Sequence, residues 1–127
     1  MKPTLLQPKN IITQSLTDNI QIKILSDQVN GAKNVATGIV ILEPGSRTPP
    51  HVRTVEEIIF VTKGTASGVT TAGEVYKMAA GECVFIPPGV EHYHENPSSE
   101  TAEQLYIFAP QGPEASLREL PVYNSTS

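Results

Sequence analysis

The sequence GECVFIPPGVEHYHEN, residues 81–96, is the most informative part of this chain. Its apolar run, Cys83 to Ile86, ends at Pro87-Pro88-Gly89, where proline cannot donate a ladder hydrogen bond and glycine permits positive φ. A strand is therefore expected to end there in a tight turn. The chain then becomes extended again with His92 and His94 two residues apart. In a strand that spacing puts both imidazoles on the same face.

A second stretch, residues 45–64 (GSRTPPHVRTVEEIIFVTKG), has a similar arrangement of a turn followed by a histidine. It begins with a Pro-Gly turn, is stiffened by Pro49-Pro50 and then reaches His51. Glu57 follows at the start of an apolar run, Ile58 to Val61. The two stretches together contain all three histidines of the protein, which indicates that they contribute to a common site.

The two stretches resemble the two sequence motifs of the cupin family. The second motif, G-x5-P-x-G-x2-H-x3-N, is matched at every fixed position, and the first motif, G-x5-H-x-H-x3-E-x6-G, at all but one. The exception is Arg53, which stands where the family has its second histidine. The matching positions are Gly45, His51, Glu57, Gly64, Gly81, Pro87, Gly89, His92 and Asn96. The resemblance implies an all-β, single-domain jelly-roll barrel, which is a double-stranded β-helix.

The resemblance also implies a metal site. In the family, the residues at the positions of His51, Glu57 and His92 converge inside the barrel. Neutral imidazole nitrogens and a carboxylate bind a divalent transition metal at about 2 Å, and two histidines with one carboxylate leave positions open for substrate or oxygen. The expected metal is iron, manganese, zinc or nickel. His94 is a candidate fourth ligand or acid–base group, because it shares the face of His92.

Arg53 makes the metal prediction conditional. Its guanidinium stays protonated and has no lone pair, so it cannot act as a ligand. At about 4 Å from the ion it would be repelled by roughly 4 kcal/mol per unit charge at an effective dielectric near 20. Two arrangements relieve this conflict. Either Arg53 turns outward and binds the carboxylate of a substrate, or it pairs with Glu57 in place of the metal and the pocket is metal-free.

The rest of the chain predicts many short strands separated by turns, without an amphipathic helix. Residues 1–19 are expected to form an extended arm that takes part in a dimer sheet. Residues 20–113 are expected to form the barrel, and residues 114–127 a short helical turn and a frayed tail. Strands are expected at 20–25, 35–42, 51–53, 57–62, 66–70, 74–78, 84–86, 92–95 and 104–108.

Alternation along these strands predicts which side chains line the cavity. Ile59 and Val61 are in register with Glu57 and are expected to face the interior with it. Gln104 and Tyr106 also share one face. The sequence leaves open whether that face points to the pocket or to a neighbouring subunit.

The composition excludes several classes of partner. A net charge of −4 without a cluster of lysine and arginine argues against nucleic acid. No apolar run reaches the roughly 18 residues that span a bilayer, and residues 1–10 lack the apolar core of a secretory signal. The single cysteine, Cys83, is typical of a reducing cytoplasm, where we expect the protein to reside. Cys83 itself is expected to be a small buried side chain beside Phe85, not a nucleophile.

Two hypotheses of different classes follow. In the first, a metalloprotein, in our interpretation a metal-dependent enzyme, acts on a small anionic metabolite by oxygenase, isomerase or lyase chemistry. The metal lies at His51, Glu57 and His92, and Arg53 holds the substrate carboxylate. In the second, a metal-free binding module carries or senses a sugar or an organic acid. A third, a scaffold with a vestigial cavity, also stays open. The N-terminal arm and the exposed strand edges predict a homodimer.

Overall fold

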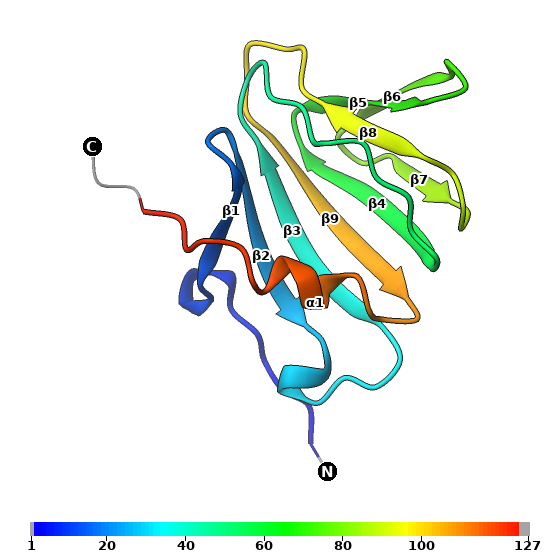
Figure 1. The fold of residues 1–127 in the computed structure, drawn as a ribbon. Coiled ribbons are helices and arrows are strands. Elements are labelled where there is room, and N and C mark those ends of the chain that lie inside the picture. Colours follow the sequence, from blue (N-terminus) through cyan, green and yellow to red (C-terminus); the bar gives the residue numbers. More distant parts are fainter. Residues whose placement is uncertain (1, 125–127) are drawn as a thin grey trace.

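The structure is a computed structural model that describes residues 2–124 (Figure 1). In that range the strands are β1 (Thr13–Thr17), β2 (Ile20–Ser26), β3 (Ala36–Leu42), β4 (Glu56–Lys63), β5 (Thr65–Thr70), β6 (Val75–Ala79), β7 (Cys83–Ile86), β8 (His92–Glu95) and β9 (Ala102–Ala109). Short 3-10 turns lie at Pro8–Asn10 and Gln28–Asn30, and one helix, α1, spans Glu114–Leu117. Part of the tail expected to fray, residues 125–127, lies outside the described residues.

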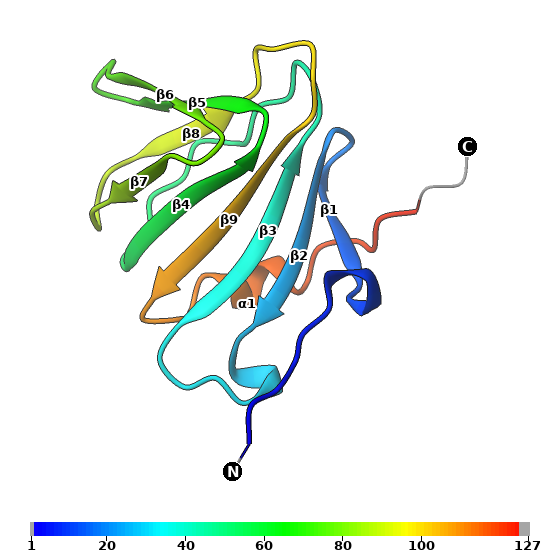
Figure 2. The ribbon, with the colours of Figure 1, turned by 180° about the vertical axis from the view of Figure 1, so that it is seen from behind.

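The strands form two antiparallel sheets within the described chain. One has the order β1-β2-β3-β9-β4-β7 and the other the order β6-β5-β8. Figures 1 and 2 show the large sheet curving from β1 to β7, with the small sheet above its β4–β7 end. The predicted all-β, double-sheet barrel is confirmed. Among residues 2–124, no helix is long and apolar enough to cross a membrane.

Alternation of side chains sets the core between the sheets. In β2, Ile20, Ile22 and Ile24 are at most 4% exposed while the residues between them are half-buried. In β9 the buried positions likewise alternate from Ala102 to Phe108. Because successive side chains of a strand point to opposite faces, one face of each strand fills the barrel.

The chain path differs from the expected one in two places. Residues 51–53 are not a strand, because only His51 makes a bridge, to His92. Pro49 and Pro50, directly before this segment, lack the backbone N–H groups that would extend the pairing of His51 into a ladder. The segment expected to be an extended arm contains β1, which pairs antiparallel with β2 of its own chain. Its single apolar side chain, Leu16, gave too little alternation to predict a strand.

Cys83 is exposed, contrary to the expectation that it is buried. The inward-facing residue of β7 is Ile86, whereas Cys83 and Phe85 lie on the outer face of the sheet. Phe60, which pairs with Cys83 in register, is also exposed. The apolar run in β7 was too short for alternation to show which of its residues face inward.

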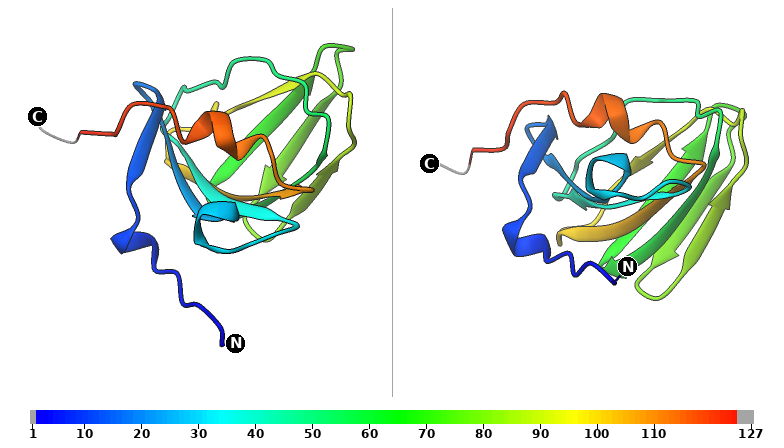
Figure 3. Two further views of the ribbon diagram at one scale, coloured as in Figure 1. Left: turned by 60° about the horizontal axis from the view of Figure 1, so that its bottom comes forward. Right: turned by 90° about the horizontal axis from the view of Figure 1, so that it is seen from below.

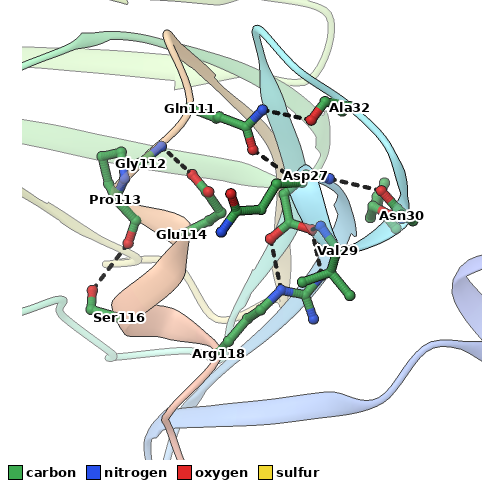
Figure 4. Close-up of polar contacts among 12 residues, drawn as sticks. Asp27, Val29, Asn30, Ala32, Gln111, Gly112, Pro113, Glu114, Ser116 and Arg118 are labelled. Carbon is green, nitrogen blue, oxygen red and sulfur yellow. Dashed lines mark hydrogen bonds and ion pairs between the residues drawn. The ribbon is translucent and has the colours of Figure 1, made fainter.

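The segment after β9 lies across one end of the barrel (Figure 3). Leu117 of α1 is 9% exposed and packs into the core. The next residue, Arg118, donates two hydrogen bonds of 2.7 Å from Nε and Nη2 to the carboxylate of Asp27, which follows β2 (Figure 4). Gln111 donates to the carbonyl of Ala32 at 2.7 Å. These contacts fix α1 over the barrel end.

Candidate metal centre

His51, Glu57 and His92 come from three separate segments that meet inside the barrel. His51 lies in the connection between β3 and β4, Glu57 is the second residue of β4, and His92 begins β8. The backbone N–H of each histidine donates to the carbonyl of the other, at 2.9 and 3.0 Å. Their rings therefore lie side by side, with centroids 4.3 Å apart.

The atoms that would bind an ion are close together. Glu57 Oε1 lies 3.9 Å from His51 Nε2 and 3.6 Å from His92 Nε2. One potential ligand atom from each residue lies within 4.8 Å of the others. These separations suit an ion that each ligand binds at about 2 Å.

Backbone carbonyls fix the tautomer of both rings. His51 Nδ1 lies 3.1 Å from the carbonyl oxygen of Pro49, and His92 Nδ1 lies 2.8 Å from that of Val90. Because a carbonyl only accepts, each Nδ1 carries the hydrogen and donates it, which leaves the lone pair on Nε2. In the neutral state of both rings, each Nε2 therefore presents its lone pair to a metal.

The three ligand atoms are also unsatisfied. His51 Nε2, His92 Nε2 and Glu57 Oε1 are buried and have no hydrogen-bond partner among residues 2–124. Leaving buried polar atoms unpaired is costly, and native structures rarely do so. A divalent cation among them would satisfy all three, so the residues present fit a transition metal.

The charges around the site favour an ionised carboxylate. Burial raises the pKa of Glu57, but His92, His51 and Arg53 together hold it below its usual value. Burial and the nearby Arg53 charge lower the pKa of His51. For His92 burial acts in the same direction, yet contact with Glu57 and the Val90 carbonyl raises its pKa overall.

Arg53 lies beside the three residues. Its Nε is 3.9 Å from Glu57 Oε1, which is too long for a hydrogen bond. Its guanidinium carbon sits 5.2 Å from the centre of the Phe108 ring, a cation–π geometry. Arg53 Nε is buried and has no hydrogen-bond partner in the described part of the chain. One donor of the guanidinium is thus available for a ligand.

His94 lies next to this cluster but is not one of its three members. Its ring centroid is 5.4 Å from that of His92, and its Nε2 is 3.1 Å from the hydroxyl of Tyr76. Burial lowers the pKa of His94 to about 4, so the ring is neutral at pH 7. Sequence reasoning missed Tyr76, although it shares the inward face of β6 with the buried Met78.

The site opens on a cavity of about 210 Å³. Its polar lining includes His51, Arg53, Glu57 and His94. The apolar walls include Leu16, Ile22, Val40, Ile59, Phe108 and Leu117. Ile59 faces the cavity as predicted, and Val61 is buried in the core.

Gln104 and Tyr106 face the cavity, not a neighbouring subunit. Both side chains are 1% exposed and line the cavity, so their shared face points inward. In β9 they alternate with half-buried residues on the opposite face.

Comparison with known proteins places this architecture in a family. The Cupin domain family matches residues 38–108, more than half of the chain. An uncharacterised protein of Streptomyces coelicolor is 30% identical over 78 residues, which cover 61% of this chain and 72% of that protein. The (R)-mandelonitrile lyase of Granulicella tundricola is 33% identical over 60 residues, 47% of this chain and 46% of the lyase.

Among solved structures, the polyketide cyclase RemF from Streptomyces resistomycificus has the same fold. The TM-score is 0.77 at 21% sequence identity, over 99% of this chain and 87% of the cyclase chain. The family match includes the segments that carry His51, Glu57 and His92, and the two-sheet barrel brings these residues together as the motifs imply. The chain therefore belongs to the cupin family.

Proposed function

We propose that this protein is a small cupin that binds a divalent transition metal through His51, Glu57 and His92 and acts on a small anionic metabolite. The observation that carries the proposal is the set of three buried ligand atoms, within 4.8 Å of one another, that have no hydrogen-bond partner in the described chain. Iron, manganese, zinc and nickel all accept this ligand set. When bound, the metal supplies a Lewis acid or, as iron, an oxygen-activating centre.

Arg53 holds the acid group of the metabolite in this proposal. Its planar guanidinium presents donors that match a carboxylate, and Phe108 supports the group from one side. The Nε–H of Arg53 is buried beside Glu57 and has no hydrogen-bond acceptor among the described residues. A bound carboxylate would supply that acceptor. The apolar walls exclude water around the bound molecule and so strengthen this contact.

His94 is the proposed acid–base group. It lines the cavity and is neutral at pH 7, so its ring is free to take up a proton from a bound substrate, and its lowered pKa makes it a weak base that returns the proton easily. The Tyr76 hydroxyl contacts its Nε2 and orients the ring. Service as a fourth ligand through Nε2 would require this contact to break.

The chemistry supported by relatives is of more than one type. Similarity to an (R)-mandelonitrile lyase over 60 residues supports a lyase reaction. Oxygenase and isomerase reactions remain open in the proposal, since likeness of fold does not select a reaction.

Elemental analysis tests the metal proposal. Protein purified without chelator is expected to contain about one transition metal ion per chain. Glu57→Gln and His92→Ala are expected to lose most of it. Glu56→Gln is the matched control, because Glu56 is the exposed neighbour of Glu57 on β4 and is expected to keep full occupancy. Wild-type protein without stoichiometric metal would overturn the proposal.

The second candidate function is a metal-free module that binds a sugar or an organic acid. The 3.9 Å approach of Arg53 Nε to Glu57 Oε1 favours it, because it places a positive charge beside the carboxylate where an ion would lie. The substitution Arg53→His separates the two candidates. If metal occupancy rises to one per chain only in Arg53→His, the metal-free module is correct. If the wild type already holds the metal, it is excluded.

A further inference from the structure

We propose that Gln104 and Tyr106 form a second recognition point in the cavity, which selects acids that carry a hydrogen-bond acceptor, such as a keto oxygen, away from the acid group. The inference rests on the proposed function, because it takes the acid end of the ligand to lie at Arg53 and the metal. It adds the substrate class: short oxo- or hydroxycarboxylic acids with an otherwise apolar body.

The first support is a pair of buried donors that face the cavity. Gln104 Nε2 and the Tyr106 hydroxyl are buried, and residues 2–124 offer neither of them a hydrogen-bond partner. Both side chains are 1% exposed and line the same cavity as Arg53. An acceptor on a bound molecule would satisfy donors that the described protein leaves unpaired.

The second support is the way the structure accommodates the Tyr106 ring. Gly38 of β3 is the register partner of Tyr106, and a Cβ at Gly38 would lie 2.1 Å from the hydroxyl oxygen and 2.2 Å from its ring carbon. The Tyr106 ring therefore occupies the space that a side chain at position 38 would fill. A phenylalanine would fill the same space without burying an unpaired hydroxyl, so packing does not explain the oxygen.

Register along β9 separates this point from the metal ligands. Glu57 pairs with Phe108, whereas Tyr106 pairs with Ile59 and Gln104 with Val61. At about 3.3 Å per residue, the backbone of Tyr106 and Gln104 lies roughly 7 and 13 Å further along the strand. The Gln104 side chain nevertheless contacts His94, next to the three candidate ligands, so the spacing of the backbone overstates the distance to its donor. A ligand held at Arg53 therefore needs its acceptor only a few atoms from its acid group.

The walls between the two ends limit what the ligand carries. Ile22, Val40 and Leu117 are apolar and leave nothing to pair with extra hydroxyl groups. A sugar would bury several hydroxyls against these walls at a cost. An acid with one remote acceptor and few other polar atoms suits the lining, and the volume of about 210 Å³ keeps it small.

Matched pairs of acids test the inference by isothermal titration calorimetry on the zinc-loaded full chain. The probes are 4-oxopentanoate and 5-oxohexanoate, each compared with the acid in which a methyl group replaces the keto oxygen, 4-methylpentanoate and 5-methylhexanoate. At least one keto acid is expected to bind roughly 3- to 10-fold more tightly than its methyl counterpart, the effect of one net hydrogen bond. Equal affinities within both pairs, or tighter binding of the methyl acids, would overturn the inference.

Variants then assign the preference to the two side chains. The double variant Gln104→Leu/Tyr106→Phe is expected to bind keto and methyl acids with a ratio near one, while it keeps or gains affinity for the methyl acids. Tyr93→Phe is the control, because Tyr93 packs against Arg47 on the other face of β8, outside the cavity lining, and its ratio is expected to stay that of the wild type. A preference that survives in the double variant would also overturn the inference.

The zinc content of each sample distinguishes this failure from failure of the proposed function. If zinc does not bind in stoichiometric amount, the metal proposal is wrong. If zinc binds but none of the four acids does, the acid proposal fails and this inference with it. If the acids bind without a keto preference, only the second recognition point is wrong.

Discussion

At the scale of single residues, Asp27 shows how strongly one buried charge depends on one partner. Its carboxylate belongs to a residue only 1% exposed and accepts two 2.7 Å hydrogen bonds from Arg118. These bonds hold the pKa of Asp27 below its usual value, against the opposing effect of burial. Asp27→Asn is expected to lower the free energy of unfolding at pH 7 by about 2 kcal/mol, because it weakens a buried charged pair.

The sign of the pH dependence follows from the lowered pKa. The pair stabilises the folded state fully above the unfolded-state pKa of about 3.9, and this stabilisation is lost as the pH falls through the folded-state pKa. Urea unfolding at several pH values should therefore show a full difference between wild type and Asp27→Asn at pH 7 that shrinks below about pH 4. Asp18→Asn, at an exposed aspartate, should show little difference at pH 7. A difference for Asp27→Asn that is the same at pH 7 and pH 3 would contradict this account.

Spacing in the sequence was enough to predict that His51, Glu57 and His92 lie together, but not their surroundings. The motif positions identified His51, Glu57 and His92, and the structure brings their ligand atoms together. The tautomers of the histidines depend on the carbonyls of Pro49 and Val90. The folded turns bring these carbonyls to the rings, and motif spacing does not predict that contact. The final place of Arg53, beside Glu57 and over Phe108, likewise depends on a neighbouring strand, and the sequence could only offer alternatives.

At the scale of strands, glycine–tyrosine pairs place two hydroxyls inside the barrel. Gly68 of β5 is the register partner of Tyr76 of β6, as Gly38 is of Tyr106. A Cβ at position 68 would lie 2.0 Å from a ring carbon of Tyr76. Gly68→Ala is therefore expected to displace the ring, break its contact with His94 and destabilise the protein by about 1–3 kcal/mol.

A double-mutant cycle measured by urea unfolding checks this cause. In a Tyr76→Ala background the ring is gone, so Gly68→Ala should cost much less than it does in the wild type. If the cost is the same in both backgrounds, the clash with Tyr76 is not its source.

Predicting the strands from alternation succeeded where one face is buried and failed elsewhere. β2 and β9 alternate regularly and were expected near their observed bounds. In β1 only Leu16 is apolar, so its sequence did not show which side chains point inward. In β7 the outward side chains are apolar as well, so apolar character did not distinguish the inner face from the outer face. The sequence of residues 51–53 is compatible with a strand, but after two prolines the segment makes a single bridge, from His51 to His92.

At the scale of the whole molecule, chain ends far apart in sequence complete the barrel. Leu117 of α1 closes one wall of the cavity, and residues near the C-terminus border β1, where Ser15 N–H donates to the carbonyl of Pro121 at 2.8 Å. The sequence predicted a short helical turn here but not that it would line the cavity. That role arises from the Arg118–Asp27 contact, which joins residues from opposite ends of the chain.

The N-terminal segment before β1 leads to a prediction about assembly. Leu5 is 81% exposed and Ile12 66% exposed, and this segment extends away from the sheets (Figures 1 and 3). Val122, next to β1, is 65% exposed. Exposed apolar side chains favour burial against a second copy, and in a two-fold dimer each chain contributes the same set.

We therefore expect a homodimer, with a mass by light scattering of twice the 13.7 kDa of one chain at micromolar concentration. Leu5→Glu/Ile12→Glu should shift the population toward the monomer, because each dimer would bury four carboxylates in the interface. Val75→Glu is the matched control, since Val75 is 61% exposed but lies on β6, in the other sheet. If wild-type protein has the mass of a single chain under these conditions, the dimer prediction is wrong. If Val75→Glu dissociates the dimer and the N-terminal variant does not, the second copy is held by the small sheet and the role assigned to residues 5–12 is wrong.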